Sequence, residues 1–446
     1  MKSKELKNGV ARSKMLRNNI LLSGVLKAIS LYTSFLIVPI TLNYIDNEPY
    51  GIWMTITSMA FWVAVFDIGL GNGMRNYLTA AISKGDFKTA GIYISSTFLL
   101  LSVIALVLAI VAIPLLYTLD IASILNTSSL SNESLRIVFL VALMLILVNF
   151  VLKNIGFIYV ALQQYALNDL LTTIGNVLAL AIVYILTKTT EGNLLYIVVT
   201  LLAMPLLAFI IGGIPLFIKY PAMRPSFKKI DIGFSKGVIK KGLGFFVIQT
   251  TSCLIIFGGS NLFISHFCGP ESVTTYNIAY KYFNLIIIGY TILIAPMWNA
   301  YTDAYVKGDW KWIQKTFKRS FIGWCLTLAV GAVMLLGCNL FYNIWVGEKV
   351  TVPVSISLSV LIFITCFNLN NCVTYLLNGL NTIYVQIWTS IAATAAYIAW
   401  VATYGRQWGA EGIVLGMAVC YAVMSIIHLY QCRLIITRKA SGIWIK

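Results

Sequence analysis

Long apolar stretches recur along the whole of this chain, and they restrict its fold more than any other feature. Of 446 residues, 59% are hydrophobic and only 11% are charged, whereas soluble domains carry about 25% charged residues. The shortage of charge extends from end to end, which leaves no room for a large soluble domain. The runs are continuous rather than alternating, so they predict membrane-spanning helices instead of the strands of a β-barrel.

Twelve of these runs are long enough to cross a bilayer, since about 20 apolar residues span its hydrocarbon core. The predicted spans are 19–44, 49–71, 89–117, 135–163, 166–187, 193–218, 242–267, 272–303, 319–346, 353–379, 382–405 and 411–433. The predicted domains are an N-terminal six-helix half (1–218), a basic cytoplasmic linker (219–241), a C-terminal six-helix half (242–433) and a cytoplasmic tail (434–446). The sequence therefore predicts an all-α polytopic membrane protein.

The basic residues predict how the chain is oriented. Of the 32 Lys and Arg, 25 lie in the termini and loops of one side and three on the other, as the positive-inside rule requires for two cytoplasmic termini. The apolar run from Ile20 to Ile45 is too long for a signal peptide, so it is expected to remain as an uncleaved first span. A net charge of +17 placed in such loops does not indicate nucleic-acid binding.

Motifs for cofactors and catalysis are missing from the sequence. The eight cysteines form no CxxC pair, and we read them as free thiols rather than metal ligands. His266 and His428, at span ends, are interpreted as satisfied or solvated side chains. Without a nucleotide-binding loop, an HExxH motif or a serine elbow, the expectation is no metal site, no cofactor, no catalytic residue and no enzymatic activity.

An internal repeat relates the two halves. The motif Lys84-Gly85-Asp86-Phe87-Lys88 returns 223 residues later as Lys307-Gly308-Asp309-Trp310-Lys311. Upstream, the segment starting at Tyr50 parallels the one starting at Tyr276. Because six spans separate the copies, both have the same orientation, which is typical of transporters. The predicted architecture is two parallel six-helix repeats around a central cavity.

The segment Asp67-Ile-Gly-Leu-Gly-Asn-Gly-Met-Arg-Asn-Tyr, together with the Tyr-Gly-Ile-Trp sequence before it and the Lys-Gly-Asp sequence after it, resembles the Wzx-type O-antigen and polysaccharide flippases. These belong to the multidrug/oligosaccharidyl-lipid/polysaccharide exporter superfamily. The resemblance implies a flippase of the bacterial cytoplasmic (inner) membrane that moves an undecaprenyl-pyrophosphate-linked oligosaccharide by alternating access. It also implies a polysaccharide polymerase and a chain-length regulator as partners, while the sequence leaves coupling to an ion gradient open.

Three lysines, Lys27, Lys153 and Lys281, lie inside predicted spans. A charge at such a depth costs at least about 2.5–3.5 kcal/mol in hydrocarbon, and no acid lies deep enough to pair with each. They predict a cationic lumen for an anionic cargo such as a pyrophosphate; structural or snorkelling lysines are the alternative. The resemblance implies basic residues in the first and eighth spans, where Lys27 and Lys281 stand. Intramembrane amides such as Asn284 fit a glycan passage, or interhelical hydrogen bonding.

A cytoplasmic gate is expected where the second predicted span ends. Glycines after Asp67 break the helix, and Arg75 belongs to a predicted interfacial helix over 72–83. Asp67 would pair with Arg75 or another cation in one state, or else only cap the next helix. Asp303, near the inner end of the eighth predicted span, invites the same interpretation.

Two other functions stay open. A drug–cation antiporter of the same superfamily would need acidic residues in its cavity, whereas the buried charge here is basic. An integral-membrane glycan-modifying enzyme would need catalytic acids or a large external loop, and the longest predicted outer loop is only about 117–134.

Overall fold

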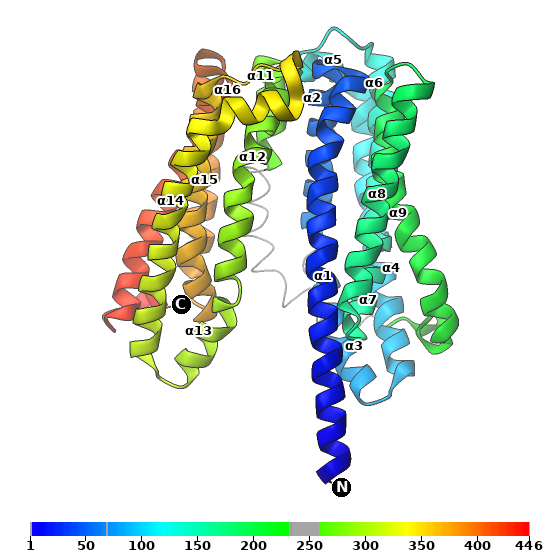
Figure 1. Cartoon of the computed structure of the whole chain (residues 1–446), viewed down its shortest axis with the longest axis vertical. Coiled ribbons are helices and arrows are strands. Elements are labelled where there is room, and N and C mark those ends of the chain that lie inside the picture. Colours follow the sequence, from blue (N-terminus) through cyan, green and yellow to red (C-terminus); the bar gives the residue numbers. More distant parts are fainter. Residues whose placement is uncertain (1, 68–69, 232, 234–257, 446) are drawn as a thin grey trace. The chain divides into compact units, whose positions relative to one another are not determined.

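The computed structural model describes residues 2–67, 70–231, 233 and 258–445, and within these ranges it is helical with no strand (Figure 1). The main helices are α1 (Lys2–Ile45), α2 (Asn47–Val65), α3 (Leu70–Ser83), α4 (Phe87–Thr118), α5 (Ile121–Leu125), α6 (Asn132–Leu152), α7 (Asn154–Ala161), α8 (Tyr165–Thr189), α9 (Leu194–Lys219), α11 (Ser260–Cys268), α12 (Pro270–Ile294), α13 (Met297–Val306), α14 (Trp310–Val346), α15 (Val354–Gly379) and α16 (Tyr384–Ile436). Nine candidate spans lie in the described part of the chain. The protein is a multi-pass membrane protein.

The predicted spans match these helices best where a turn signal bounds the apolar run. Helices α8, α9 and α15 begin and end within two residues of the predictions, and α3 covers the residues of the helix predicted over 72–83. One prediction of a single span was wrong: 272–303 ends at Ile294 before Pro296. The prediction 135–163 matches the candidate span Asn132–Ala161, in which a turn at Lys153 separates α6 from α7. Gly409, with φ 61°, separates the last two spans within α16. Most of the predicted span 242–267 lies outside the described residues.

The chain folds into two compact units. The N-terminal unit comprises Met1–Asp46, Met59–Ile121 and Leu130–Phe246. The C-terminal unit comprises Asn47–Ser58, Ala122–Ser129 and Val247–Lys446. These units differ from the predicted halves because the first part of α2 and the segment 122–129 pack with the C-terminal unit.

In the N-terminal unit, α1 packs along α8, α8 along α9, and α6 along α9. The described start of the basic linker is tied to α4: the Ser226 N–H donates to Ser95 Oγ (3.0 Å), and the Asp231 N–H donates to Ser96 Oγ (2.8 Å). Glycine allows this close approach, because a Cβ on Gly91 would lie 2.2 Å from the Ala222 carbonyl oxygen. The linker is therefore held against its own unit at least as far as residue 231.

In the C-terminal unit, α15 packs against α12, α14 and α16. The start of α2 joins the same unit through a hydrogen bond from the Thr274 hydroxyl to the Asn47 carbonyl (2.6 Å). A Cβ on Gly51 would lie 1.8 Å from the Pro270 carbonyl oxygen, so only glycine permits this contact. The two sequence landmarks that suggested an internal repeat, Tyr50 and Tyr276, are both buried in this unit.

The Lys-Gly-Asp motifs form matching turns in the two units. Gly85 and Gly308 adopt left-handed conformations with φ of 75° and 71°. The carboxylate that follows caps the next helix in each copy: Asp86 accepts from the Thr89 N–H and Asp309 from the Trp312 N–H, both at 3.0 Å. Glycine is needed because other residues rarely adopt positive φ, and aspartate is a preferred N-cap. Each motif thus ends one helix and starts the next.

Candidate functional site

A helix break at Lys153 lies deep in the N-terminal unit, between α6 and α7. The side chain of the next residue, Asn154, is fully buried, and its Nδ2 donates to the carbonyls of Phe150 (3.0 Å) and Val151 (3.2 Å). This amide satisfies two carbonyls of the last turn of α6, which is how a helix can be broken inside an apolar span. The Lys153 ammonium lies 5.5 Å from the centroid of the Phe150 ring.

Asp67 meets this break from the turn between α2 and α3. Its carboxylate accepts hydrogen bonds from the Gly71 N–H at 3.2 and 3.4 Å, and it interacts electrostatically with Lys153. A Cβ on Gly71 would lie 2.5 Å from the Phe157 ring and 2.7 Å from Asn154 Oδ1. Because Gly71 lacks a Cβ, α3 can pack closely on α7 and bring opposite charges together.

The structure bears on two of the site predictions. Asp67 is the acid that interacts electrostatically with Lys153, but no ion pair joins the two in the part of the chain that the structure describes. Within the described residues, Asp67 forms no ion pair with Arg75. Arg75 lies half-buried on α3, where its carbonyl accepts from the Thr79 hydroxyl (2.8 Å). Asp67 also caps α3, as the alternative interpretation expected.

Lys27 belongs to the same unit but lies on its exposed surface. Its side chain is exposed, whereas its neighbour Leu26 is buried. The Leu26 carbonyl accepts from the Thr173 hydroxyl of α8 (3.2 Å), and Ser30 Oγ lies 2.9 Å from Thr173 Oγ1. Lys27 therefore stands on a face of α1 that α8 does not cover.

In the C-terminal unit, α12 carries Lys281 in a stripe of polar side chains. Asn277, Lys281 and Asn284 recur at i, i+4 and i+7, which places them on one helix face. Lys281 is half-buried. The Tyr280 hydroxyl donates to Asn284 Oδ1 (3.3 Å), and the Tyr280 ring stacks on Tyr276 with centroids 5.8 Å apart. Aromatic rings, amides and an ammonium thus share one segment of the helix.

Sequence reasoning missed the hydrogen bonds that hold this stripe in place. Asn277 Nδ2 donates to Asn261 Oδ1 (2.9 Å), and Asn261 Nδ2 donates in turn to the Met54 carbonyl and to Ser58 Oγ, each at 3.0 Å. The amide content of the spans was the available signal, but spacing alone does not show which amides meet. These hydrogen bonds connect α12, α11 and α2, whereas Asn284 accepts a hydrogen bond from Tyr280, one turn before it on α12.

Asp303 has a local partner. Lys307 Nζ lies 2.7 Å from Asp303 Oδ2, and both side chains are exposed. Such exposed pairs contribute about 0–1 kcal/mol. The histidines are satisfied as interpreted: His266 Nδ1 lies 2.9 Å from the Ile124 carbonyl oxygen, and His428 lies between Asn370 Oδ1 (3.0 Å) and Thr389 Oγ1 (2.9 Å). No cluster of metal ligands occurs among the residues that the structure describes.

Solved structures with similar folds are transporters. The chain superposes on an inward-facing multidrug resistance MATE family transporter of the MOP superfamily with a TM-score of 0.70 and 16% identity, covering 94% of this chain and 96% of that one. It superposes on the lipid II flippase MurJ, in an inward closed conformation, with a TM-score of 0.63 and 14% identity, covering 93% and 87%. These likenesses establish the fold, that of twelve-helix transporters built from two repeats.

Relatives found by sequence identify the family to which the chain belongs. A protein of Salmonella typhimurium named as a candidate O-antigen transporter is 24% identical over 404 residues, which is 86% of this chain and 88% of that protein. The family model described as polysaccharide biosynthesis protein matches residues 16–297. This match includes Lys27, Asp67, Lys153 and Lys281 and extends over more than half of the sequence. The chain therefore belongs to the polysaccharide biosynthesis protein family.

Proposed function

We propose that this protein is a flippase that moves an undecaprenyl-pyrophosphate-linked oligosaccharide from the cytoplasmic to the outer leaflet of the bacterial inner membrane. Both termini lie in the cytoplasm, and the two units alternately open a passage to each side. Support comes from the O-antigen transporter name of the Salmonella relative and from the fold shared with a lipid II flippase. The protein acts as a transporter rather than an enzyme.

The exposed position of Lys27 carries the proposal. It lies inside an apolar helix, on a face that its own unit leaves uncovered. Facing lipid there would cost several kcal/mol, whereas facing a water-filled passage would not. An ammonium in such a passage attracts an anionic cargo, and the pyrophosphate between prenol and glycan is a suitable one. Lys27 and Lys281 each lack the bidentate guanidinium of arginine, so other donors share in binding the phosphate.

The α12 stripe supplies those donors in the proposal. Lys281 binds a phosphate oxygen, and Asn284 hydrogen-bonds to the phosphate or to the first sugar. The Tyr280 ring, which is half-buried and stacks on the buried Tyr276, offers an aromatic face of the kind that packs against sugar rings. This combination of one cation, amides and aromatic rings suits a charged head group attached to a neutral glycan better than it suits a cationic drug.

Asp67 and Lys153 form the gate in this account. While they face one another, the positive charge of Lys153 is compensated. A movement of α3 relative to α7 would separate the two charges and make the ammonium available to phosphate. Arg75 is the alternative partner of Asp67 in the separated state. Asp303 acts similarly in the other unit by exchanging Lys307 for another cation. An ion gradient supplies the driving force, and a polymerase and a chain-length regulator act on the delivered unit.

Complementation tests the proposal. A strain lacking the gene receives wild type, Lys27→Ala, Lys281→Ala or Lys2→Ala, the last as a control in the basic N-terminus, with the amount of each protein in the membrane confirmed. We expect both span variants to lose surface polysaccharide and accumulate lipid-linked repeat units, while the control behaves as wild type. Wild-type behaviour of both span variants would contradict the anionic-cargo account.

The same strains distinguish the flippase from a drug–cation antiporter. This alternative is tested because the chain shares its fold with a multidrug resistance MATE family transporter. If the protein exported cationic drugs, its deletion would lower drug resistance without accumulation of lipid-linked units. We expect the reverse: accumulation of those units with unchanged drug resistance.

A further inference from the structure

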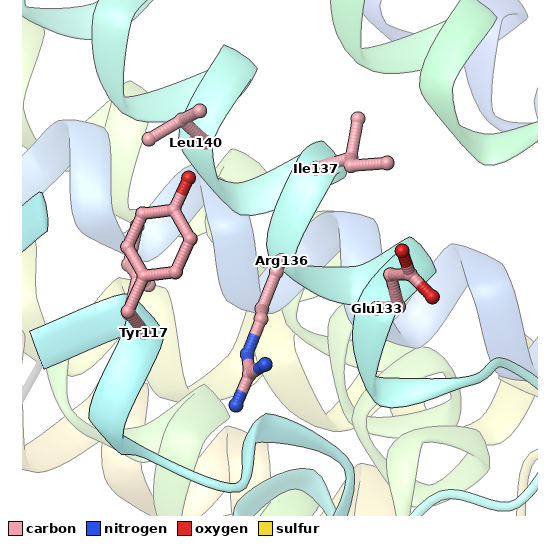
Figure 2. Close-up of a pocket in the computed structure, with 6 residues that line it drawn as sticks. Tyr117, Glu133, Arg136, Ile137 and Leu140 are labelled. Atoms are coloured by element: carbon pink, nitrogen blue, oxygen red, sulfur yellow. The ribbon is translucent and has the colours of Figure 1, made fainter.

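A pocket on the N-terminal unit joins the end of α4 to the start of α6. It has a volume of about 320 Å³ and is lined by Leu116, Tyr117, Glu133, Arg136, Ile137 and Leu140. That volume would hold about ten water molecules at roughly 30 Å³ each. Figure 2 shows Arg136 between Tyr117 and Glu133, with Ile137 and Leu140 on the same stretch of α6. The pocket thus combines one base, one acid and one aromatic ring with apolar walls.

The charged groups in this pocket have no ion-pair partner in the part of the chain that the structure describes. Arg136 Nε is buried and finds no acceptor in the described part of the chain. Glu133 precedes Arg136 by one helical turn, a spacing at which opposite charges often pair, yet no ion pair joins them in that part. A buried donor without an acceptor costs about 1–3 kcal/mol, so an acceptor supplied from outside would be stabilising.

A second, apolar cavity, here called the groove, shares Leu140 with the pocket. Leu140 lines both the pocket and a neighbouring cavity of about 290 Å³, whose other lining residues are Val141, Met144, Leu145 and Val199. Arg136 and Leu145 are nine residues apart, or about 13 Å along the helix axis. That length is close to one leaflet of a hydrocarbon core about 30 Å thick. A polar pocket above an apolar groove of this length matches the shape of a phospholipid.

We propose that this site binds a phospholipid with a zwitterionic ethanolamine head group. Arg136 binds the phosphate, Glu133 accepts hydrogen bonds from the ammonium, and one acyl chain lies along the groove from Leu140 to Leu145. Given the orientation proposed above, the lipid belongs to the outer leaflet.

Charge decides between this lipid and the other phosphate-bearing lipids. Glu133 and Arg136 together carry no net charge, so a zwitterion is matched. A pyrophosphate or an anionic phospholipid would place uncompensated negative charge beside Glu133. A choline head group would keep the positive charge but could not donate hydrogen bonds to the carboxylate. The site is therefore separate from the proposed path of the cargo.

Competitive retention of lipids tests the assignment. The purified full-length protein is equilibrated in micelles with equal amounts of phosphatidylethanolamine, phosphatidylcholine and phosphatidylglycerol that have identical acyl chains. Native mass spectrometry then counts the lipids that remain bound. We expect wild type to prefer phosphatidylethanolamine about tenfold over the other two, the ratio that one charge-assisted hydrogen bond supplies.

Two variants test which side chains bind the lipid head group. Glu133→Gln should reduce the preference over phosphatidylcholine to about onefold, and Arg136→Gln should lower retention of all three lipids about tenfold. The matched controls are Glu191→Gln and Arg406→Gln, which alter exposed residues elsewhere and should match wild type. Equal retention of the three lipids by wild type, a preference for phosphatidylglycerol, or unchanged retention by Arg136→Gln would each overturn the proposal. The first two results need no variant, so misfolding cannot obscure them, and none of them depends on flippase activity.

Discussion

The two units each place a lysine well inside an apolar span, but they surround it differently. In the N-terminal unit, Lys153 stands between α6 and α7 and interacts electrostatically with Asp67. In the C-terminal unit, Lys281 stands within the continuous helix α12, in a stripe with Asn277, Tyr280 and Asn284. The first setting places the charge near a carboxylate at a junction between two helices, and the second places it among amide and phenol side chains.

This difference arises on a shared framework. The turns at Gly85 and Gly308 have the same conformation and the same capping carboxylate, so the repeats have kept their connections while their span residues have diverged. The comparison suggests that Lys281 serves binding and Lys153 serves switching. Two experiments on the lysines test that division, and two on the turns test the shared framework, in order of decreasing expected effect.

The largest effect is expected from Lys281. Lys281→Met should reduce transport about 10- to 100-fold, because it removes charge-assisted contacts of about 1.5–3 kcal/mol to the cargo. Lys281→Arg, which keeps the charge, should retain most of the activity. The measurement is the ratio of lipid-linked repeat units to surface polysaccharide in the deletion strain. Equal loss in both variants would indicate a packing role instead.

A double-mutant cycle examines the Lys153 site. Asp67→Asn keeps an oxygen that can cap α3 but removes the charge, so it should lower the free energy of unfolding by about 1–2 kcal/mol. In a Lys153→Met background the same change should be nearly neutral. The measurement is unfolding of the purified protein in detergent. An identical effect of Asp67→Asn in both backgrounds would show that the two charges act independently.

The matching turns provide a symmetric test of stability. Gly85→Ala and Gly308→Ala should each lower the free energy of unfolding by about 1 kcal/mol, because alanine is disfavoured at positive φ while no atom lies within 4 Å of the added Cβ. Gly337→Ala, inside α14 and equally uncrowded, should be neutral or stabilising. If the two turn variants differed by more than the error of the measurement, the turns would not be equivalent.

The smallest effect concerns the Asp86 cap, which lies in the loop before α4. Hydrogen bonds from Thr89 hold the pKa of the Asp86 carboxyl below its ordinary value. A lowered pKa stabilises the fold above the ordinary value near 3.9, and that contribution is lost as the pH falls through the folded pKa. Hydrogen exchange of the Thr89 amide should therefore accelerate below about pH 4 relative to Asp86→Asn. A constant ratio of the two rates over that range would refute the cap's role.

Much of the fold could be predicted from the sequence, because span length and charge placement reflect the bilayer directly. The helices α8, α9 and α15 lie where the apolar runs predicted them. The turn at Lys153 could not be located, because apolar sequence continues through it. Pro296, in contrast, is a helix-breaking signal that the prediction of 272–303 overlooked. At Lys153, the carbonyls freed by the break are satisfied by the Asn154 side chain, a local arrangement that composition does not reveal.

The candidate site was predicted less completely. The intramembrane lysines were visible as isolated charges in apolar runs, and the lone acid Asp67 was visible as a helix-end residue. Their meeting depends on the close packing of α3 on α7 at Gly71, which is a tertiary contact between segments more than 80 residues apart in sequence. The pocket at Arg136 was missed for the same reason, since Tyr117 and Arg136 come from different helices.

Reconstituted transport tests the central claim most directly. Proteoliposomes that contain wild type, Lys281→Met or Lys281→Arg are loaded with polyprenyl lipids bearing the same glycan on a pyrophosphate or on an uncharged linkage, and the fraction reaching the opposite leaflet is measured. The account predicts rapid movement of the pyrophosphate lipid by wild type and Lys281→Arg, slow movement by Lys281→Met, and little movement of the uncharged lipid. Equal movement of both lipids by wild type would contradict the claim that buried lysines select an anionic cargo.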